Sequence, residues 1–183
     1  MAESLYPRLH TSHIYCGCKT NIILAIEVTD KGVADNNVDV VGKILGGTTR
    51  YFNIKEFVAD KAYSSRAVFK ILRELHLEPY IPFKRGSTGE PKGIYLWRKT
   101  YQEFCNNTVE YMKRYHARSN IEATNQMIKE RLGHYVRTKS LQSNINEIKT
   151  KALCHNILVL IQEIFESGVD VKFEDCVKIA QTV

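Results

Sequence analysis

The sequence predicts an α/β protein with a helical C-terminal region. Two stretches near the N-terminus have the pattern of paired strands, and a short apolar run at 56–60 is followed by a segment that favours a helix. In the last third, apolar residues recur every three or four positions, which is the period of a helix. At 183 residues, with 44% hydrophobic and 25% charged residues, the chain can form one packed domain.

The N-terminal half should contain strands and helices in alternation. Residues 9–18 and 21–29 are predicted to form an antiparallel strand pair that turns at Lys19-Thr20-Asn21. A helix over 36–45 should end at Gly46-Gly47. The remaining elements are a strand at 56–60, a helix at 65–76, and a strand at 78–83 that runs into the Gly-rich loop 84–89.

The C-terminal half should be helical. Helices are expected at 96–114 and 115–132, either separate or continuous, with Gly133 as the C-terminal stop. We expect residues 1–168 to form a single domain and 169–183 to form a short tail. A long last helix at 142–166 should present an apolar surface made by Ile145, Ile148, Ala152, Ile157, Leu160, Ile161 and Ile164.

Four polar residues are spaced so that they share one side of a helix. Tyr115, Arg118, Glu122 and Lys129 are separated by steps of 3, 4 and 7, which bring their side chains to within about 60° of arc. Ala117, Ile121, Thr124, Ile128 and Leu132 form an adjacent stripe that should face the core. Carboxylate oxygens suit hard cations, and Arg and Lys suit phosphate oxygens. The polar stripe therefore fits a metal ion beside a phosphate chain.

Two simpler interpretations of the same residues remain open. Ser119-Asn120-Ile121-Glu122 fits a capping box, in which a helix starts at Ser119 and Glu122 folds back onto the backbone. Arg118 and Glu122, four positions apart, also fit an intrahelical ion pair. Tyr115 would then be a half-buried aromatic residue.

A further carboxylate is expected at a strand end. Phe57-Val58-Ala59-Asp60 predicts an apolar strand that ends in Asp60, before a helix that begins near Ser64 or Ser65. In α/β sheets, ligands commonly bind where strands end.

Taken together, these features resemble the DDE transposases of insertion sequences, in particular the group with the Tyr-Arg-Glu-Lys signature. The resemblance covers nearly the whole chain. The stretches that carry it are 18–21 with 25–29, 60–65, 80–84, 96–99, 115–129 and Leu153-Cys154-His155-Asn156.

The resemblance implies a ribonuclease H-like mixed sheet flanked by helices, in which two Asp and one Glu hold a pair of Mg²⁺ or Mn²⁺ ions. Asp60 matches the second Asp and Glu122 matches the Glu, but nothing matches the first Asp. The chain is therefore expected to be the C-terminal part of a catalytic domain whose first strand is missing. Asp35 is the most plausible substitute for the missing Asp, although an Asp just before a helix is more often an N-cap.

Charge and composition agree with DNA as the partner. The net charge is +6, and residues 84–151 hold 14 Lys or Arg against 6 Asp or Glu. This basic excess could neutralise DNA phosphates, although a solvated charged face would look the same. The resemblance implies phosphate contacts for Arg118 and Lys129, and Tyr115 could add a hydrogen bond. Arg137 and Lys139 are expected to touch the DNA backbone or to be solvated loop cations.

The remaining features of the sequence do not indicate a zinc site, a membrane segment or a further catalytic residue. The Cys16-x-Cys18 spacing does not suit the usual zinc pairs, so we expect reduced thiols in a cytoplasmic, nucleoid-associated protein. No run of 18 apolar residues and no signal peptide is present, so no membrane partner is expected. Trp97 is expected to be a core anchor rather than a base-stacking residue, and His134 is not expected to act as a general base.

The sequence thus predicts a transposase fragment that binds transposon ends and target DNA. The implied chemistry is Mg²⁺-dependent phosphodiester hydrolysis followed by strand transfer, with no activity in the isolated chain. The alternative is a non-catalytic DNA-binding or interaction module that pairs with itself or with an intact transposase and interferes with it.

Overall fold

The computed structural model describes residues 10–138 and 140–168. Two antiparallel strands come first, β1 (His10–Cys16) and β2 (Ile23–Asp30), and Ile14 pairs with Ile26. Two short parallel strands follow, β3 (Glu56–Val58) and β4 (Glu78–Tyr80). The described residues therefore contain two separate two-stranded sheets and not the single mixed sheet that was predicted.

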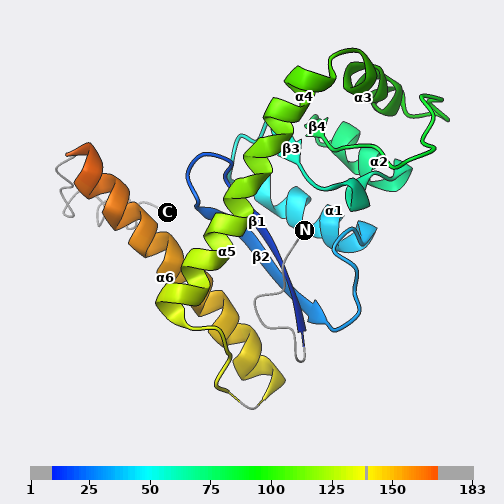
Figure 1. Ribbon diagram of the computed structural model, residues 1–183. Helices are drawn as coiled ribbons and strands as arrows, with labels where there is room; N and C mark the ends of the chain where they lie inside the picture. The colour runs from blue at the N-terminus through cyan, green and yellow to red at the C-terminus, as the bar shows by residue number, and fades with distance from the viewer. Residues whose placement is uncertain (1–9, 139, 169–183) are drawn as a thin grey trace.

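Helices make up most of the rest of the described chain (Figure 1). Two 3₁₀ segments, η1 and η2, connect longer elements. In Figure 1, α4 (Thr108–Tyr115) and α5 (Ser119–Leu132) follow one another as a single rod that ends beside α6 (Leu141–Ser167). The helical elements are α1 (Val38–Thr48), η1 (Lys61–Tyr63), α2 (Arg66–Glu74), α3 (Tyr95–Asn106), α4 (Thr108–Tyr115), η2 (His116–Arg118), α5 (Ser119–Leu132) and α6 (Leu141–Ser167).

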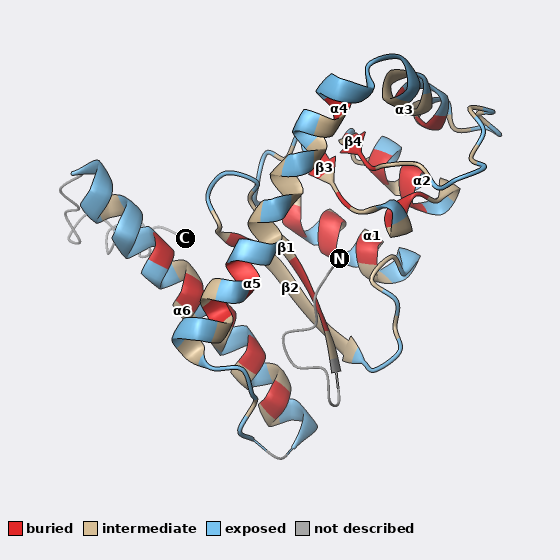
Figure 2. Ribbon diagram, viewed as in Figure 1, coloured by how far each residue is buried: buried red, intermediate tan, exposed pale blue. Residues whose placement is uncertain are grey.

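Buried side chains form two clusters (Figure 2). The larger cluster lies among α1, α2, β3, β4 and α3, and Trp97 belongs to it with 5% of its surface exposed. Trp97 is therefore the core anchor that was predicted. The smaller cluster joins the β1–β2 hairpin to α5 and α6 through Ile14, Ile23, Ile128, Ile148 and Ala152.

Several predicted boundaries are wrong. Gly46 and Gly47 lie inside α1, which continues to Thr48, whose buried hydroxyl donates to the carbonyl of Ile44. The boundary expected between 114 and 115 is present, because α4 ends at Tyr115, but the single helix expected over 96–114 is divided at Asn107 into α3 and α4. Gly133 does end α5, with a φ of 88° that favours glycine. The tail 169–183 lies outside the described residues, so the domain division at 168 stays a prediction.

Candidate active site

A cavity of about 650 Å³ separates the two sheets. One wall is β1, with Ile14, Tyr15 and Cys16, and the opposite wall is β3 with the residues that follow it. Leu45 of α1 and Ile121 of α5 also line the cavity. Segments far apart in the sequence therefore meet around one cavity, and most of the surface that lines it is apolar.

Both walls are strand edges that have no strand neighbour on the cavity side within the described residues. β1 pairs only with β2, and β3 pairs only with β4. The amide of Glu78 donates to the carbonyl of Lys55, and the amide of Ala59 donates to the carbonyl of Tyr80. Because backbone groups alternate in direction along a strand, those of Glu56 and Val58 point away from β4, towards the cavity that both residues line.

Asp60 lies in the wall of this cavity, two residues after the end of β3. It is the N-cap of η1, and its carboxylate accepts a hydrogen bond of 2.7 Å from the amide of Ala62. The side chain is partly buried. The sequence correctly predicted a carboxylate at a strand end, and the 3₁₀ turn that holds it is a feature that only the structure reveals.

Arg118 comes into the same cavity from the other side, at the end of η2. Its guanidinium pairs with Glu122 at 3.0 Å, and the side chains are 15% and 56% exposed. Glu122 is not among the residues that line the cavity. Of the two carboxylates predicted to converge, the structure places only Asp60 in the cavity wall.

The structure decides between the two simpler interpretations of Glu122. The Ser119 hydroxyl donates to the carbonyl of His116, and the N-terminus of α5 has no side-chain cap. The capping box is therefore absent. The intrahelical ion pair between Arg118 and Glu122 is present.

The predicted polar stripe is altered by η2. A 3₁₀ segment turns about 120° per residue instead of 100°, so three such residues rotate everything after them by roughly 60°. Tyr115 ends α4, and its ring lies 5.9 Å from the Arg118 guanidinium. Lys129 is half-buried further along α5. The core-facing stripe is confirmed, because Thr124 and Ile128 are buried.

Of the two cations predicted after α5, Arg137 is not among the residues that line the cavity. The amide of Arg137 donates to the Glu147 carboxylate at 2.9 Å, and the amide of Thr138 donates to the same group at 3.2 Å. The Arg137 side chain itself is exposed. Lys139 lies outside the described residues. DNA contacts by these two residues stay predictions.

The described part of the chain does not by itself form a complete metal site. It contains no cluster of three or more His, Cys, Asp or Glu side chains placed to hold an ion. Asp60 has the right chemistry for a hard cation, but Glu122 is held by Arg118. The two-ion arrangement implied by the resemblance therefore needs at least one further ligand and a rearranged Glu122.

Asp35 is not the helix cap considered above. The N-cap of α1 is Asn37, whose side chain accepts from the amides of Asp39 and Val40. Asp35 instead lies 3.3 Å from Nδ1 of His13, a fully buried histidine whose other ring nitrogen contacts the Thr29 hydroxyl. This polar contact ties the loop before α1 to the hairpin.

Burial controls the protonation of the groups around the cavity. It raises the pKa of the Cys16 thiol to about 11, against a weaker opposing hydrogen bond with Thr124. Burial also raises the pKa of Tyr15 and of Tyr63. These three groups are neutral at pH 7. The carboxylic acids in the lining are Asp60 and Glu56, and Glu56 pairs with Arg114.

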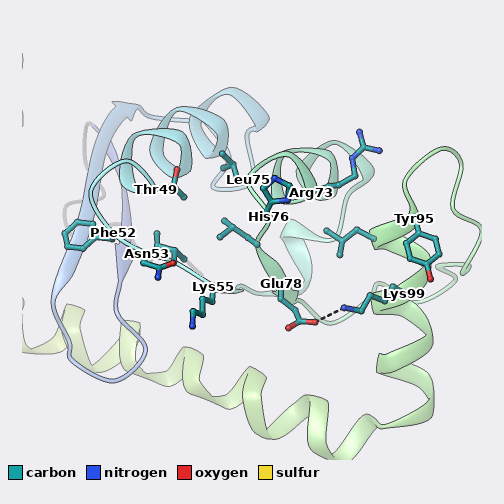
Figure 3. A pocket seen from close by; sticks show the side chains of 13 residues that line it. Thr49, Phe52, Asn53, Lys55, Arg73, Leu75, His76, Glu78, Tyr95 and Lys99 are labelled. Carbon is teal, nitrogen blue, oxygen red and sulfur yellow. Dashed lines mark hydrogen bonds and ion pairs between the residues drawn. The ribbon is translucent and has the colours of Figure 1, made fainter.

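A second cavity of about 740 Å³ lies beside β4 (Figure 3). Lys55, Arg73, His76 and Lys99 line it together with Glu78. Glu78 pairs with Lys99 at 3.0 Å, which neutralises the one carboxylate in the lining. The cationic side chains in this lining are suited to contact an anion. The one carboxylate there, Glu78, is already paired with Lys99.

Two structural contacts were not predicted from the sequence. Nε2 of the buried His155 lies 3.0 Å from the carbonyl of Asn21, and Asn156 hydrogen-bonds the backbone of Ile23. Both residues belong to Leu153-Cys154-His155-Asn156, one of the stretches in which the chain resembles DDE transposases. That resemblance was the signal in the sequence that could have indicated their importance. Together they hold α6 against the start of β2.

Comparison with known protein families agrees with this arrangement. The transposase DDE domain model matches residues 8–157, which is most of the chain. The chain belongs to this family. The finer assignment to the Tyr-Arg-Glu-Lys group stays a prediction. Searches of curated proteins and of solved structures gave no significant match. No helix within 10–168 is both long and apolar enough to span a bilayer.

Proposed function

We propose that this chain acts on DNA as the C-terminal part of a transposase catalytic domain, with Asp60 as one catalytic carboxylate. The family chemistry is Mg²⁺-dependent hydrolysis of a phosphodiester, followed by attack of the freed 3′ hydroxyl on target DNA. The observation that carries the proposal is the position of Asp60 and Arg118 in one cavity between the facing edges of β1 and β3.

The same cavity explains why the isolated chain should be inactive. A strand placed between β1 and β3 would unite the two small sheets into one mixed sheet of the ribonuclease H-like kind. Its backbone would meet the groups of Glu56 and Val58 that point into the cavity. A carboxylate on such a strand would lie near Asp60 and could supply the missing ligand. Without it, two carboxylates do not hold two ions.

The alternative function is a non-catalytic module that binds DNA or an intact transposase. The ion pair between Arg118 and Glu122 favours this alternative, because it occupies the predicted third carboxylate. The two functions differ in whether supplying the missing strand restores cleavage.

The experiment incubates the purified chain with supercoiled plasmid, and with duplex DNA that flanks its gene, in Mg²⁺ or Mn²⁺. We expect salt-sensitive binding to both DNAs and no nicking. Nicking that is lost in Asp60→Asn would mean that the chain is a complete enzyme. Absence of DNA binding at low salt would contradict the proposed function and, within the alternative, would leave only a module that binds an intact transposase.

A second arm adds, in trans, the matching N-terminal portion of an intact transposase of this family. Restored nicking that requires Asp60 supports the catalytic fragment. Binding without any restored nicking supports the non-catalytic module.

A further inference from the structure

The second cavity, beside β4, combines positive charge with exposed aromatic rings. Within the described residues, three Lys or Arg side chains line it against one carboxylate, that of Glu78. Tyr95 is 73% exposed and Phe52 is 45% exposed. Figure 3 shows these two rings at opposite ends of the cavity, with Lys55, Glu78 and Lys99 between them. The chemistry proposed for the first cavity, which holds Asp60, uses none of these side chains.

The rest of the lining of the second cavity is largely apolar. Leu77 is buried, and Ile54, Leu75 and Leu96 are half-buried. Apolar surface beside cations suits a ligand that has both a flat apolar face and negative charge, because each part then meets a matching surface. A simple inorganic anion would leave the apolar surface and the two rings without a contact.

His76 occupies a strained position in this lining. It follows α2 with a φ of 55°, in the left-handed region that favours glycine. Its amide donates to the carbonyl of Arg73 at 3.2 Å, and the amide of Leu77 donates to the carbonyl of Leu72 at 2.9 Å, which is the pattern of helices that end in glycine. The imidazole is exposed, so core packing does not offset the strain. Strain of this kind is concentrated at binding sites.

The two cavities adjoin each other. Residues 52–55 line both of them, and Asp60 lies five positions further along the chain. A DNA strand held at Asp60 would therefore reach the second cavity by crossing this segment. An unpaired strand offers base faces to aromatic rings and phosphates to cations, whereas a duplex keeps its base faces stacked inside.

We propose that the second cavity binds an unpaired stretch of a DNA strand, with bases on the rings of Tyr95 and Phe52 and phosphates at Lys55 and Lys99. Glu78 limits the affinity, because its carboxylate pairs with Lys99 at 3.0 Å and repels phosphate. The inference rests on the proposed function, since the strand is part of the DNA on which the first cavity acts.

Fluorescence anisotropy tests the preference for unpaired DNA. The full chain is titrated into labelled single strands of about 12 nucleotides, which is within the site sizes of single-strand grooves, and into duplexes of the same sequence. We expect the single strand to bind at least about tenfold more tightly, because two rings stack on its bases. Tyr95→Ala should weaken single-strand binding by about fivefold or more and change duplex binding by less than about twofold. Tyr135→Ala is the matched control, since Tyr135 is 74% exposed and is not in the lining.

The charges give a test in the opposite direction. Glu78→Gln keeps the size of the side chain and frees Lys99, so it should tighten single-strand binding by about threefold to tenfold. Glu163→Gln, at an exposed position on α6, removes the same charge elsewhere and should change binding by less than about twofold. Lys99→Ala should weaken binding and lower the salt slope by about 0.7. Circular dichroism at 222 nm checks that each variant is folded.

Equal affinities for single strand and duplex would overturn the proposal, and so would single-strand binding that Tyr95→Ala leaves unchanged. Weaker binding in Glu78→Gln would equally contradict it. Displacement of the single strand by polyglutamate at a lower concentration than by unlabelled DNA would identify a docking site for an acidic protein instead. Failure of the proposed function has a different signature, because that function is judged by nicking restored in trans. Restored nicking without a preference for single strands would refute the second cavity alone.

Discussion

Asn156 on α6 holds Ile23 at the start of β2 by two hydrogen bonds of 2.8 Å each. The side-chain oxygen accepts from the amide of Ile23, and the side-chain nitrogen donates to the carbonyl of the same residue. Ile23 is buried, so its backbone has little access to water in place of Asn156. One amide side chain therefore joins α6 to the hairpin that forms one wall of the cavity.

Replacing this amide should destabilise the whole fold. Asn156→Ala leaves a buried donor and a buried acceptor unsatisfied, which costs about 1–3 kcal/mol of unfolding free energy. Urea denaturation followed by circular dichroism measures the loss. Asn146→Ala is the control, because Asn146 is exposed on the same helix and should change stability by less than about 0.5 kcal/mol. Equal stabilities of the two variants would show that the contact does not hold α6.

Tyr111 links α4 to β4 and should make stability fall in alkaline solution. Its hydroxyl accepts from the amide of Ile81 at 2.8 Å, and burial raises its pKa above the ordinary value of 10.0. The folded state therefore keeps a proton that the unfolded chain releases above pH 10. This contribution to stability is complete below pH 10 and is lost as the pH rises further.

Tyr111→Phe separates this effect from the loss of the hydrogen bond. The variant should be less stable than the wild type by about 1–3 kcal/mol at pH 7. The difference should shrink above pH 10, by up to about 1.4 kcal/mol per pH unit. Urea denaturation at pH 7, 9 and 10.5 gives the comparison, with Tyr135→Phe as an exposed control. A difference that grows with pH would contradict the assignment.

The ion pair between Arg118 and Glu122 should be weak enough to open. Glu122 is 56% exposed, and exposed pairs contribute roughly 0.2–1 kcal/mol. A double-mutant cycle with Arg118→Ala and Glu122→Gln should give a coupling free energy in this range. Arg118→Ala alone should cost more than Glu122→Gln, because the Arg118 side chain is 15% exposed and loses packing as well. Coupling above about 2 kcal/mol would show that Glu122 is locked and unavailable to a metal ion.

The elements predicted from local periodicity are largely present, and the errors have physical causes. The hairpin, the strand before Asp60 and the stop at Gly133 depend on local sequence, and the structure confirms them. The continuation of α1 through Gly46 and Gly47 depends on burial of Leu45 and Thr48, a tertiary effect that overrides helix propensity.

The site was harder to predict than the elements. The stripe from Tyr115 to Lys129 assumed a uniform helix, but η2 interposes a tighter turn that no residue type in His116–Arg118 signals. The last helix was assigned a single apolar surface. The structure divides it, burying Ile148 and Ala152 while exposing Ile157 and Leu160. Periodicity identifies apolar residues, but which of them meet the domain depends on the packing of α6.

We propose that Asp60 marks the catalytic cavity. Mn²⁺ titrated into ¹⁵N-labelled chain, with paramagnetic broadening of amide signals as the readout, tests this claim most directly. We expect weak, millimolar binding that first broadens the signals of Asp60 to Ala62 and then those of neighbouring residues in the cavity wall, and Asp60→Asn should abolish it. Broadening centred on another carboxylate, such as Glu103, and unchanged in Asp60→Asn would contradict the assignment of the site.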